Sequence, residues 1–238
     1  MKLNAIINIL VLIFNMIVYN LKIVFANKFI WFLAGSVLFY LGLSVIYVFT
    51  NDVSQMEDLY GVFLFSGILL VFYPSVFGIQ NDQDARTIEI LFGIPNYRYK
   101  VWLVRLILIF LIAFIIMIVF TLLSSVLIVR FRYVSMALQV MAPVVFLGML
   151  AFMLSTVIRN GNGTAVIMIF IGLIFTITID SLTRSQWNIF LNPYDIPWGV
   201  NEASWKIITI KNRIILITGS ILFLLAALFN LQKREKFM

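Results

Sequence analysis

Long apolar runs without a charged residue constrain this chain more than any other feature. The clearest one extends from Leu106 to Val129 and is bounded by Arg105 and Arg130. At about 1.5 Å per residue, a helix of this length crosses the ~30 Å hydrocarbon core of a bilayer. Comparable runs recur along the sequence. They predict an all-α polytopic membrane protein, because helices satisfy their own backbone hydrogen bonds in lipid.

Composition supports the membrane class and excludes several kinds of site. Apolar residues make up 63% of the chain, charged residues make up 11%, and the mean hydropathy is +1.08. The chain contains no Cys and no His, which excludes disulfides, thiolate metal sites and the usual general base. Ionisable residues are also missing from the middle of each predicted span, which argues against an ion-coupled pump. We therefore expect no metal, no bound cofactor and no catalysis in this chain.

The sequence predicts one membrane domain over residues 1–238. Residues 1–28 hold the uncharged run Leu3–Leu21, whose polar side chains recur at helical spacing. This spacing indicates an interfacial amphipathic helix, with a membrane span as the alternative. A basic tail of residues 232–238 follows the spans of residues 29–231. The six predicted spans are Phe29–Asn51, Leu59–Asn81, Leu106–Val129, Tyr133–Ile158, Thr164–Ile179 and Ile214–Leu231.

The distribution of Lys and Arg predicts the orientation. With the N-terminus inside, the connections on the cytoplasmic side hold more of these residues than the outer connections. This bias favours both termini on the cytoplasmic side. We expect the membrane to be a bacterial cytoplasmic membrane. The same bias also accounts for the net charge of +7 without a nucleic-acid partner.

The connection between the fifth and sixth predicted spans, Asp180–Arg213, is the longest polar one. Its Trp and Pro residues suit either a re-entrant outer gate or an aromatic belt at the membrane interface, and both interpretations remain open. Three bases near its end are expected at the lipid headgroups, because long cationic side chains extend toward water. They are Lys206, Lys211 and Arg213. Residues 159–164 are predicted to form a loop because they are rich in Gly and Asn.

The stretch Asn81–Lys100 concentrates charge between two apolar runs. Acidic residues at its beginning suit a helix N-terminus. Ile88, Leu91 and Phe92 then form an apolar stripe at spacings i, i+3 and i+4, which suits a groove on a partner, and Gly93–Pro95 ends the helix. The stretch is therefore either a solvated positive-inside loop or a cytoplasmic docking helix of about residues 82–95.

This stretch resembles the motif of the ABC-2 membrane family, the permeases of type-2 ABC exporters. That family has acidic residues, a Gly-Thr, a Leu-Glu-x-Leu-Leu-like run, a Pro, a base, and a Lys that enters the next span. Arg86 departs from the pattern, because the family often has Gly at this position. The overall helix plan also matches along nearly the whole chain. The residues that carry the resemblance are Asp82, Asp84, Thr87–Leu91, Pro95 and Arg98, with Arg105 in place of the Lys.

The resemblance implies a non-catalytic permease subunit of an ATP-driven exporter. The sequence has no Gly-x4-Gly-Lys-Ser/Thr loop, so ATP and Mg²⁺ would bind to a separate ATPase chain. Two cytoplasmic ABC ATPase subunits and a second permease, identical or paralogous, are the implied partners, together with membrane lipids. The residues implied to dock the ATPase as a coupling helix are Asp82, Asp84, Arg86, Thr87, Glu89, Leu91, Phe92, Pro95 and Arg98.

The spans offer aromatic residues and no charged pocket, which favours an amphipathic, lipid-linked, or peptide- or drug-like substrate. Candidate residues for its path are Phe63, Phe65, Phe72, Tyr73, Phe170 and Phe175. The alternative function is a membrane scaffold that recruits a cytoplasmic ATPase without translocating a substrate. A membrane-embedded enzyme is disfavoured by the lack of His and Cys.

Overall fold

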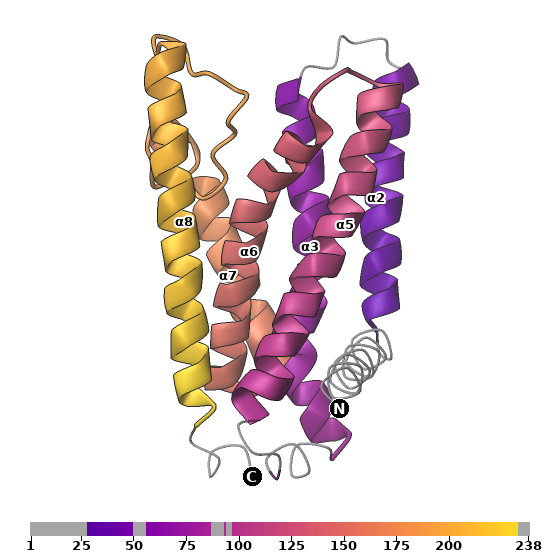
Figure 1. Ribbon diagram of the computed structural model, residues 1–238, viewed down its shortest axis with the longest axis vertical. Coiled ribbons are helices and arrows are strands. Elements are labelled where there is room, and N and C mark those ends of the chain that lie inside the picture. The colour runs from indigo at the N-terminus through magenta and orange to yellow at the C-terminus, as the bar shows by residue number, and fades with distance from the viewer. Residues whose placement is uncertain (1–27, 50–55, 87–92, 94–96, 233–238) are drawn as a thin grey trace, which may run out of the picture.

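The computed structural model describes residues 28–49, 56–86, 93 and 97–232, and all structural statements concern these residues. They form an elongated bundle of helices, with no strand in these ranges (Figure 1). The predicted interfacial helix over Leu3–Leu21 lies outside them. The elements are α2 (Phe29–Phe49), α3 (Met56–Asp84), the π-helix η1 (Arg98–Leu103), α5 (Val104–Leu127), α6 (Tyr133–Ile158), α7 (Gly161–Ile177), the 3-10 helix η2 (Asp180–Leu182) and α8 (Glu202–Asn230).

Among the residues that the structure describes, five helices are long and apolar enough to cross a membrane. This confirms the prediction of a polytopic helical membrane protein. The fourth predicted span, Tyr133–Ile158, has the bounds of α6. The fifth apolar run forms α7, which has only 17 residues.

Several predicted boundaries are wrong because polar residues continue or cap helices. The helix of the second span continues through Asp84 instead of ending at Asn81. α7 begins at Gly161, inside the predicted loop, because the Asn160 side chain accepts a hydrogen bond from the Gly163 amide at 3.0 Å. α8 begins at Glu202, twelve residues before the predicted Ile214, and Asn201 caps it in the same way. Asn is among the best residues for this capping role.

The bundle has two ends that Figure 1 shows as lower and upper. α3, α6 and α8 descend to the lower end, where η1 and α7 begin. α2, α5 and α7 rise toward the upper end, where residues 178–201 connect α7 to α8. α3 and α6 lie at the centre of the bundle. In the most apolar 18-residue stretch of each helix, 67% of the residues are buried in α3, against 17% in α2.

Small and polar residues join the helices inside the bundle. Ser36 of α2 donates to the Ser66 carbonyl of α3 at 3.0 Å, and Ser155 of α6 donates to the Val76 carbonyl of α3 at 3.0 Å. The Tyr40 hydroxyl donates to the Phe120 carbonyl of α5 at 3.0 Å. Such side-chain hydrogen bonds and close contacts hold helices together in lipid, where apolar surface alone gives no preference for protein neighbours.

Candidate functional site

The lower end of the bundle contains both flanks of the predicted docking stretch. α3 ends at Asp84, and η1 begins at Arg98. Asp84 and Arg86 are exposed here, and Arg98 is partly buried. Five of the predicted docking residues lie outside the described residues: Thr87, Glu89, Leu91, Phe92 and Pro95.

Arg86 terminates α3 in the left-handed region, with φ of 53°. Its amide donates to the Gln83 carbonyl at 2.9 Å, which closes the last turn. Glycine is the favoured residue at such a helix end, because a side chain is sterically disfavoured at positive φ. Arg86 stands where the ABC-2 motif often has Gly, and the helix still ends in a turn at this position.

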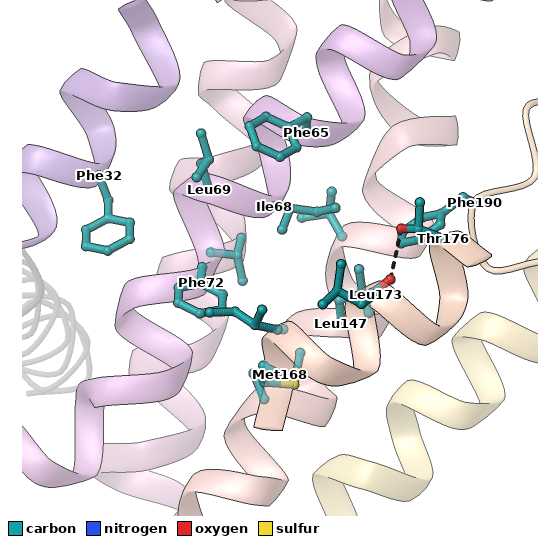
Figure 2. Close-up of a pocket in the computed structure, with 16 residues that line it drawn as sticks. Phe32, Phe65, Ile68, Leu69, Phe72, Leu147, Met168, Leu173, Thr176 and Phe190 are labelled. Atoms are coloured by element: carbon teal, nitrogen blue, oxygen red, sulfur yellow. Dashed lines mark hydrogen bonds between the residues drawn. The ribbon is translucent and has the colours of Figure 1, made fainter. Parts of the chain in front are cut away.

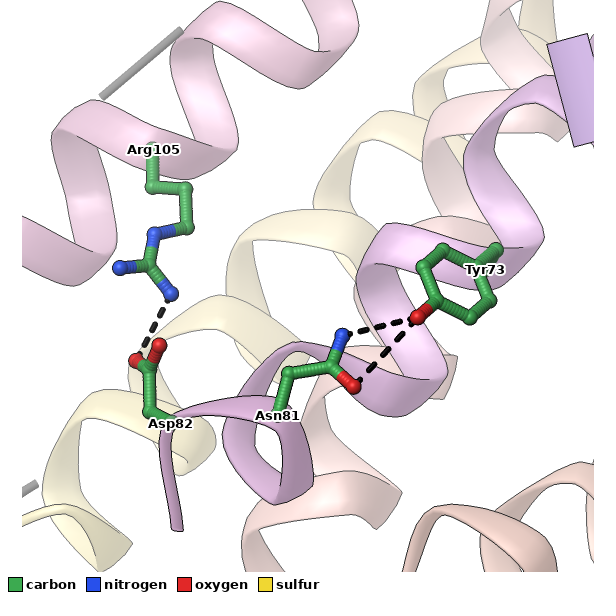
Figure 3. A network of polar contacts seen from close by, with 4 residues as sticks. All are labelled: Tyr73, Asn81, Asp82 and Arg105. Carbon is green, nitrogen blue, oxygen red and sulfur yellow. Dashed lines mark hydrogen bonds and ion pairs between the residues drawn. The ribbon is translucent and has the colours of Figure 1, made fainter. Parts of the chain in front are cut away.

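Asp82 does not begin a helix, contrary to the sequence prediction. It lies in the last turns of α3 and forms a 2.8 Å ion pair with Arg105 of α5 (Figure 3). The two side chains are only 7% and 6% exposed. The pair joins the end of α3 to the start of α5, and Arg105 is buried between helices instead of extending to the membrane surface.

Arg105 makes a second contact with an aromatic ring. Its guanidinium carbon lies 4.8 Å from the centre of the Trp102 ring, a cation–π arrangement. The Nε and Nη2 atoms of Arg105 have no hydrogen-bond partner among the described residues. Within the described part of the chain, Asp82 is therefore the one charge partner that offsets the burial of this cation.

The residues after the docking stretch contact the end of α8. The Tyr97 hydroxyl donates to the Leu231 carbonyl, and Arg98 donates to the Leu228 carbonyl at 3.5 Å. Tyr97 is buried together with Trp102 and Leu228. These carbonyls lie at the C-terminal end of α8, where helix carbonyls lack partners within the helix. η1, which follows Tyr97, is a π-helix, a rare form that is common at functional sites.

A cavity of about 440 Å³ lies between α2, α3, α6 and α7 (Figure 2). Its walls are almost entirely apolar. Phe65 and Phe72, both predicted for the substrate path, line it from α3. Met168 and Leu173 face it from α7, and Phe190 contributes from the connection that follows α7.

The other four predicted path residues do not line this cavity. Phe63 is fully buried in the core, and Phe170 is exposed on α7. Tyr73 is stacked with Phe32 at 5.1 Å and accepts a hydrogen bond from Asn81 at 3.1 Å (Figure 3). Phe175 contacts the ring of Phe190 edge-on at 6.4 Å. A lone aromatic residue in an apolar run does not indicate which side of its helix faces a neighbour.

The upper end contains a polar cluster that the sequence analysis missed. Arg213, expected at the headgroups, is buried in α8. It donates to Gln139 at 2.8 Å, to Tyr60 at 3.1 Å and to the Leu191 carbonyl at 3.2 Å. Within the described residues it has no ion pair. Burial raises the pKa of the Tyr194 hydroxyl, although a hydrogen bond with Ser135 and the charge of Arg213 act in the opposite direction.

One signal in the sequence could have identified this cluster. Asn201 followed by Glu202 has the pattern of a helix cap and first turn. A helix that starts there places Arg213 more than two turns inside it, where a cation requires partners.

The chain matches no protein-family model, no curated protein and no solved structure. The resemblance to the ABC-2 permeases therefore rests on the residues of Asn81–Lys100 and on the helix plan.

Proposed function

We propose that this chain is the permease subunit of an ATP-driven exporter of the ABC-2 type. α7 would also cross the membrane, as the fifth of six spans: at 1.5 Å per residue it is about 25 Å long, slightly shorter than the average hydrocarbon core. Six spans place both termini on one side of the membrane. The Lys and Arg bias makes that side, and the lower end of the bundle, cytoplasmic.

The observation that carries the proposal is the attachment of both flanks of the docking stretch to separate helices. Asp82 joins α3 to α5 through Arg105, and Tyr97 joins the start of η1 to the end of α8. A force applied by an ATPase to the segment between residues 86 and 97 would reach three membrane helices through buried contacts. A purely solvated loop would need no such attachment.

The cavity supports transport in preference to a scaffold role. Its volume of about 440 Å³ lies within the usual range of small-molecule pockets. Its apolar walls suit the hydrophobic part of an amphipathic substrate, and Phe65 and Phe72 provide aromatic surface on α3. A scaffold that only recruits an ATPase would have no use for this volume.

The exposed face of α7 supports a second permease as a partner. Only Gly161, Thr164 and Met168 of this helix are buried. Large apolar residues that do not line the cavity are exposed along it and would face lipid or a second copy, including Val166, Ile174 and Ile177.

Transport can be tested in proteoliposomes that contain the chain and an ABC ATPase sought in the neighbouring reading frames. A phospholipid with a short fluorescent acyl chain serves as an amphipathic probe. We expect ATP-dependent movement of the probe, and we expect Phe72→Ala to change its rate because the cavity loses an aromatic wall. Phe49→Ala is the matched control, since Phe49 is 80% exposed at the end of α2 and lies outside the cavity. Identical behaviour of the two variants, or no ATP-dependent movement, would argue against the proposal.

A further inference from the structure

At the upper end, side chains of α8 donate hydrogen bonds to main-chain carbonyls of the connection that follows α7. Asn212 donates to the carbonyls of Gln186 and Asn188, both at 2.8 Å. Trp205 donates to the Pro193 carbonyl at 3.2 Å. All the donors belong to α8, and all the acceptors are main-chain oxygens of residues 186–193, which we call the upper segment.

Arg213 adds a charged link to the same segment. It donates to the Leu191 carbonyl at 3.2 Å and is only 9% exposed. A buried cation is costly unless every donor finds an acceptor, so the Leu191 carbonyl is a necessary part of its surroundings. The upper segment is thereby joined to α8 at four of its residues, and it carries Phe190 to the wall of the cavity.

At the lower end, the C-terminal end of the same helix contacts Tyr97, near the end of the docking stretch. Tyr97 donates to the Leu231 carbonyl, and its ring is buried against Leu228 and Ala227. One uninterrupted helix of 29 residues carries both sets of contacts. Arg213 and Leu231 are 18 residues apart in the sequence, which is about 27 Å along a helix axis.

The interface between α8 and α6 is loose at one place and close at another. A groove of about 330 Å³ lies between them, lined in part by Met141, Met149 and Leu224. Near the middle of α8, Gly219 packs so closely against Phe146 that a Cβ atom there would lie 2.7 Å from the ring. The groove and this close contact both lie between residues 217 and 224, in the middle of α8 and between its upper and lower polar contacts.

We propose that α8 is the element that couples the docking stretch to the outer wall of the cavity. Tyr97 moves the lower end of α8, and Asn212 and Arg213 make the upper segment, with Phe190, follow that movement. These three residues act as positioning residues in the transport cycle. The inference rests on the proposed function and specifies the route by which the ATPase would reshape the cavity.

Spin labels can test this coupling, because the chain contains no Cys. One label replaces Trp187 on the upper segment and the other replaces Val126 near the upper end of α5. Both residues are exposed, at 62% and 76%. Electron–electron distance measurements in lipid nanodiscs then report where the upper segment lies relative to α5.

Tyr97→Ala is expected to shift the mean distance on the order of 2 Å, the size of typical helix shifts, or to add a second distance population. Tyr99→Ala is the matched control: Tyr99 is two residues away but exposed, and it should leave the distance unchanged. In an Asn212→Ala background, the effect of Tyr97→Ala should be lost. If Tyr97→Ala does not fold, Tyr97→Phe removes only the hydroxyl and is expected to cause a smaller shift in the same direction.

An unchanged distance in a folded Tyr97 variant, or an equal shift with Tyr99→Ala, would overturn the coupling role of α8. The measurement requires neither ATPase nor substrate. A negative result would therefore leave the exporter proposal standing, and a failure of ATP-dependent transport would leave the coupling measurement valid.

Discussion

The buried ion pair between Asp82 and Arg105 allows a quantitative prediction. Asp82→Asn keeps the shape of the side chain but leaves the Arg105 cation buried without its carboxylate. Removing one partner of a buried ion pair costs about 3–5 kcal/mol. Two of the Arg105 nitrogen atoms already lack hydrogen-bond partners among the described residues, so no other acceptor among those residues offsets the loss of the carboxylate.

Two smaller effects bear on the expected loss of unfolding free energy. Asp82 lies near the C-terminal end of α3, where a negative charge opposes the helix dipole, and its neutralisation returns about 0.3–1 kcal/mol. The contact between Arg105 and Trp102 remains in the variant and contributes nothing to the difference. We therefore expect the free energy of unfolding to fall by roughly 2–5 kcal/mol.

The assay is equilibrium unfolding in bicelles by steric trapping, which gives free energies for membrane proteins. Asp84→Asn is the matched control, because Asp84 is exposed in the same turn and should stay within about 0.5 kcal/mol of the wild type. Asp82→Asn combined with Arg105→Met should lose less than the sum of the two single variants. A loss below about 1 kcal/mol for Asp82→Asn, or an equal loss for Asp84→Asn, would refute the view that this pair braces α3 against α5.

Three further substitutions test other parts of the fold by the same unfolding measurement. Gly148→Ala should lower the unfolding free energy by about 1–3 kcal/mol, because its Cβ would lie 2.8 Å from the Phe110 ring; a neutral result would mean that α6 packs less closely than described. Arg86→Gly should raise it by up to about 1 kcal/mol, since glycine relieves the positive φ; a clear loss would contradict that helix end. Tyr40→Phe should cost about 0.6–1.7 kcal/mol, the range for hydrogen bonds between membrane helices, and no change would show that this bond contributes nothing.

The apolar runs were sufficient to predict a helical membrane protein and most helix positions. Hydrophobicity decides whether a segment enters lipid, and it acts locally along the chain. The bounds of α6 follow from the charged residues Arg132 and Arg159 on either side of it. α8 was predicted too short because Arg213 and Lys211 were taken as the end of a polar connection, whereas Arg213 is buried by partners on α3 and α6.

The candidate site was only partly predictable for a related reason. The charge of Asp82 and Arg86 marked the lower end of the bundle correctly. However, the pairing of Asp82 with Arg105, 23 residues later, depends on how α3 and α5 pack. The cavity could not be located either, because Phe63, Phe65 and Phe72 have the same chemistry and differ only in the direction in which the folded helix presents them.

The central claim is that the stretch Asn81–Lys100 docks an ATPase, and co-purification tests it most directly. An ABC ATPase, sought in the reading frames next to this chain, is expressed with the tagged wild type and with Glu89→Lys, using Glu202→Lys at the opposite end of the bundle as the control. We expect the wild type and Glu202→Lys to retain the ATPase and Glu89→Lys to lose most of it, while all three chains remain folded. Retention of the ATPase and of transport by Glu89→Lys would contradict a docking role for Glu89 and leave the stretch a solvated loop.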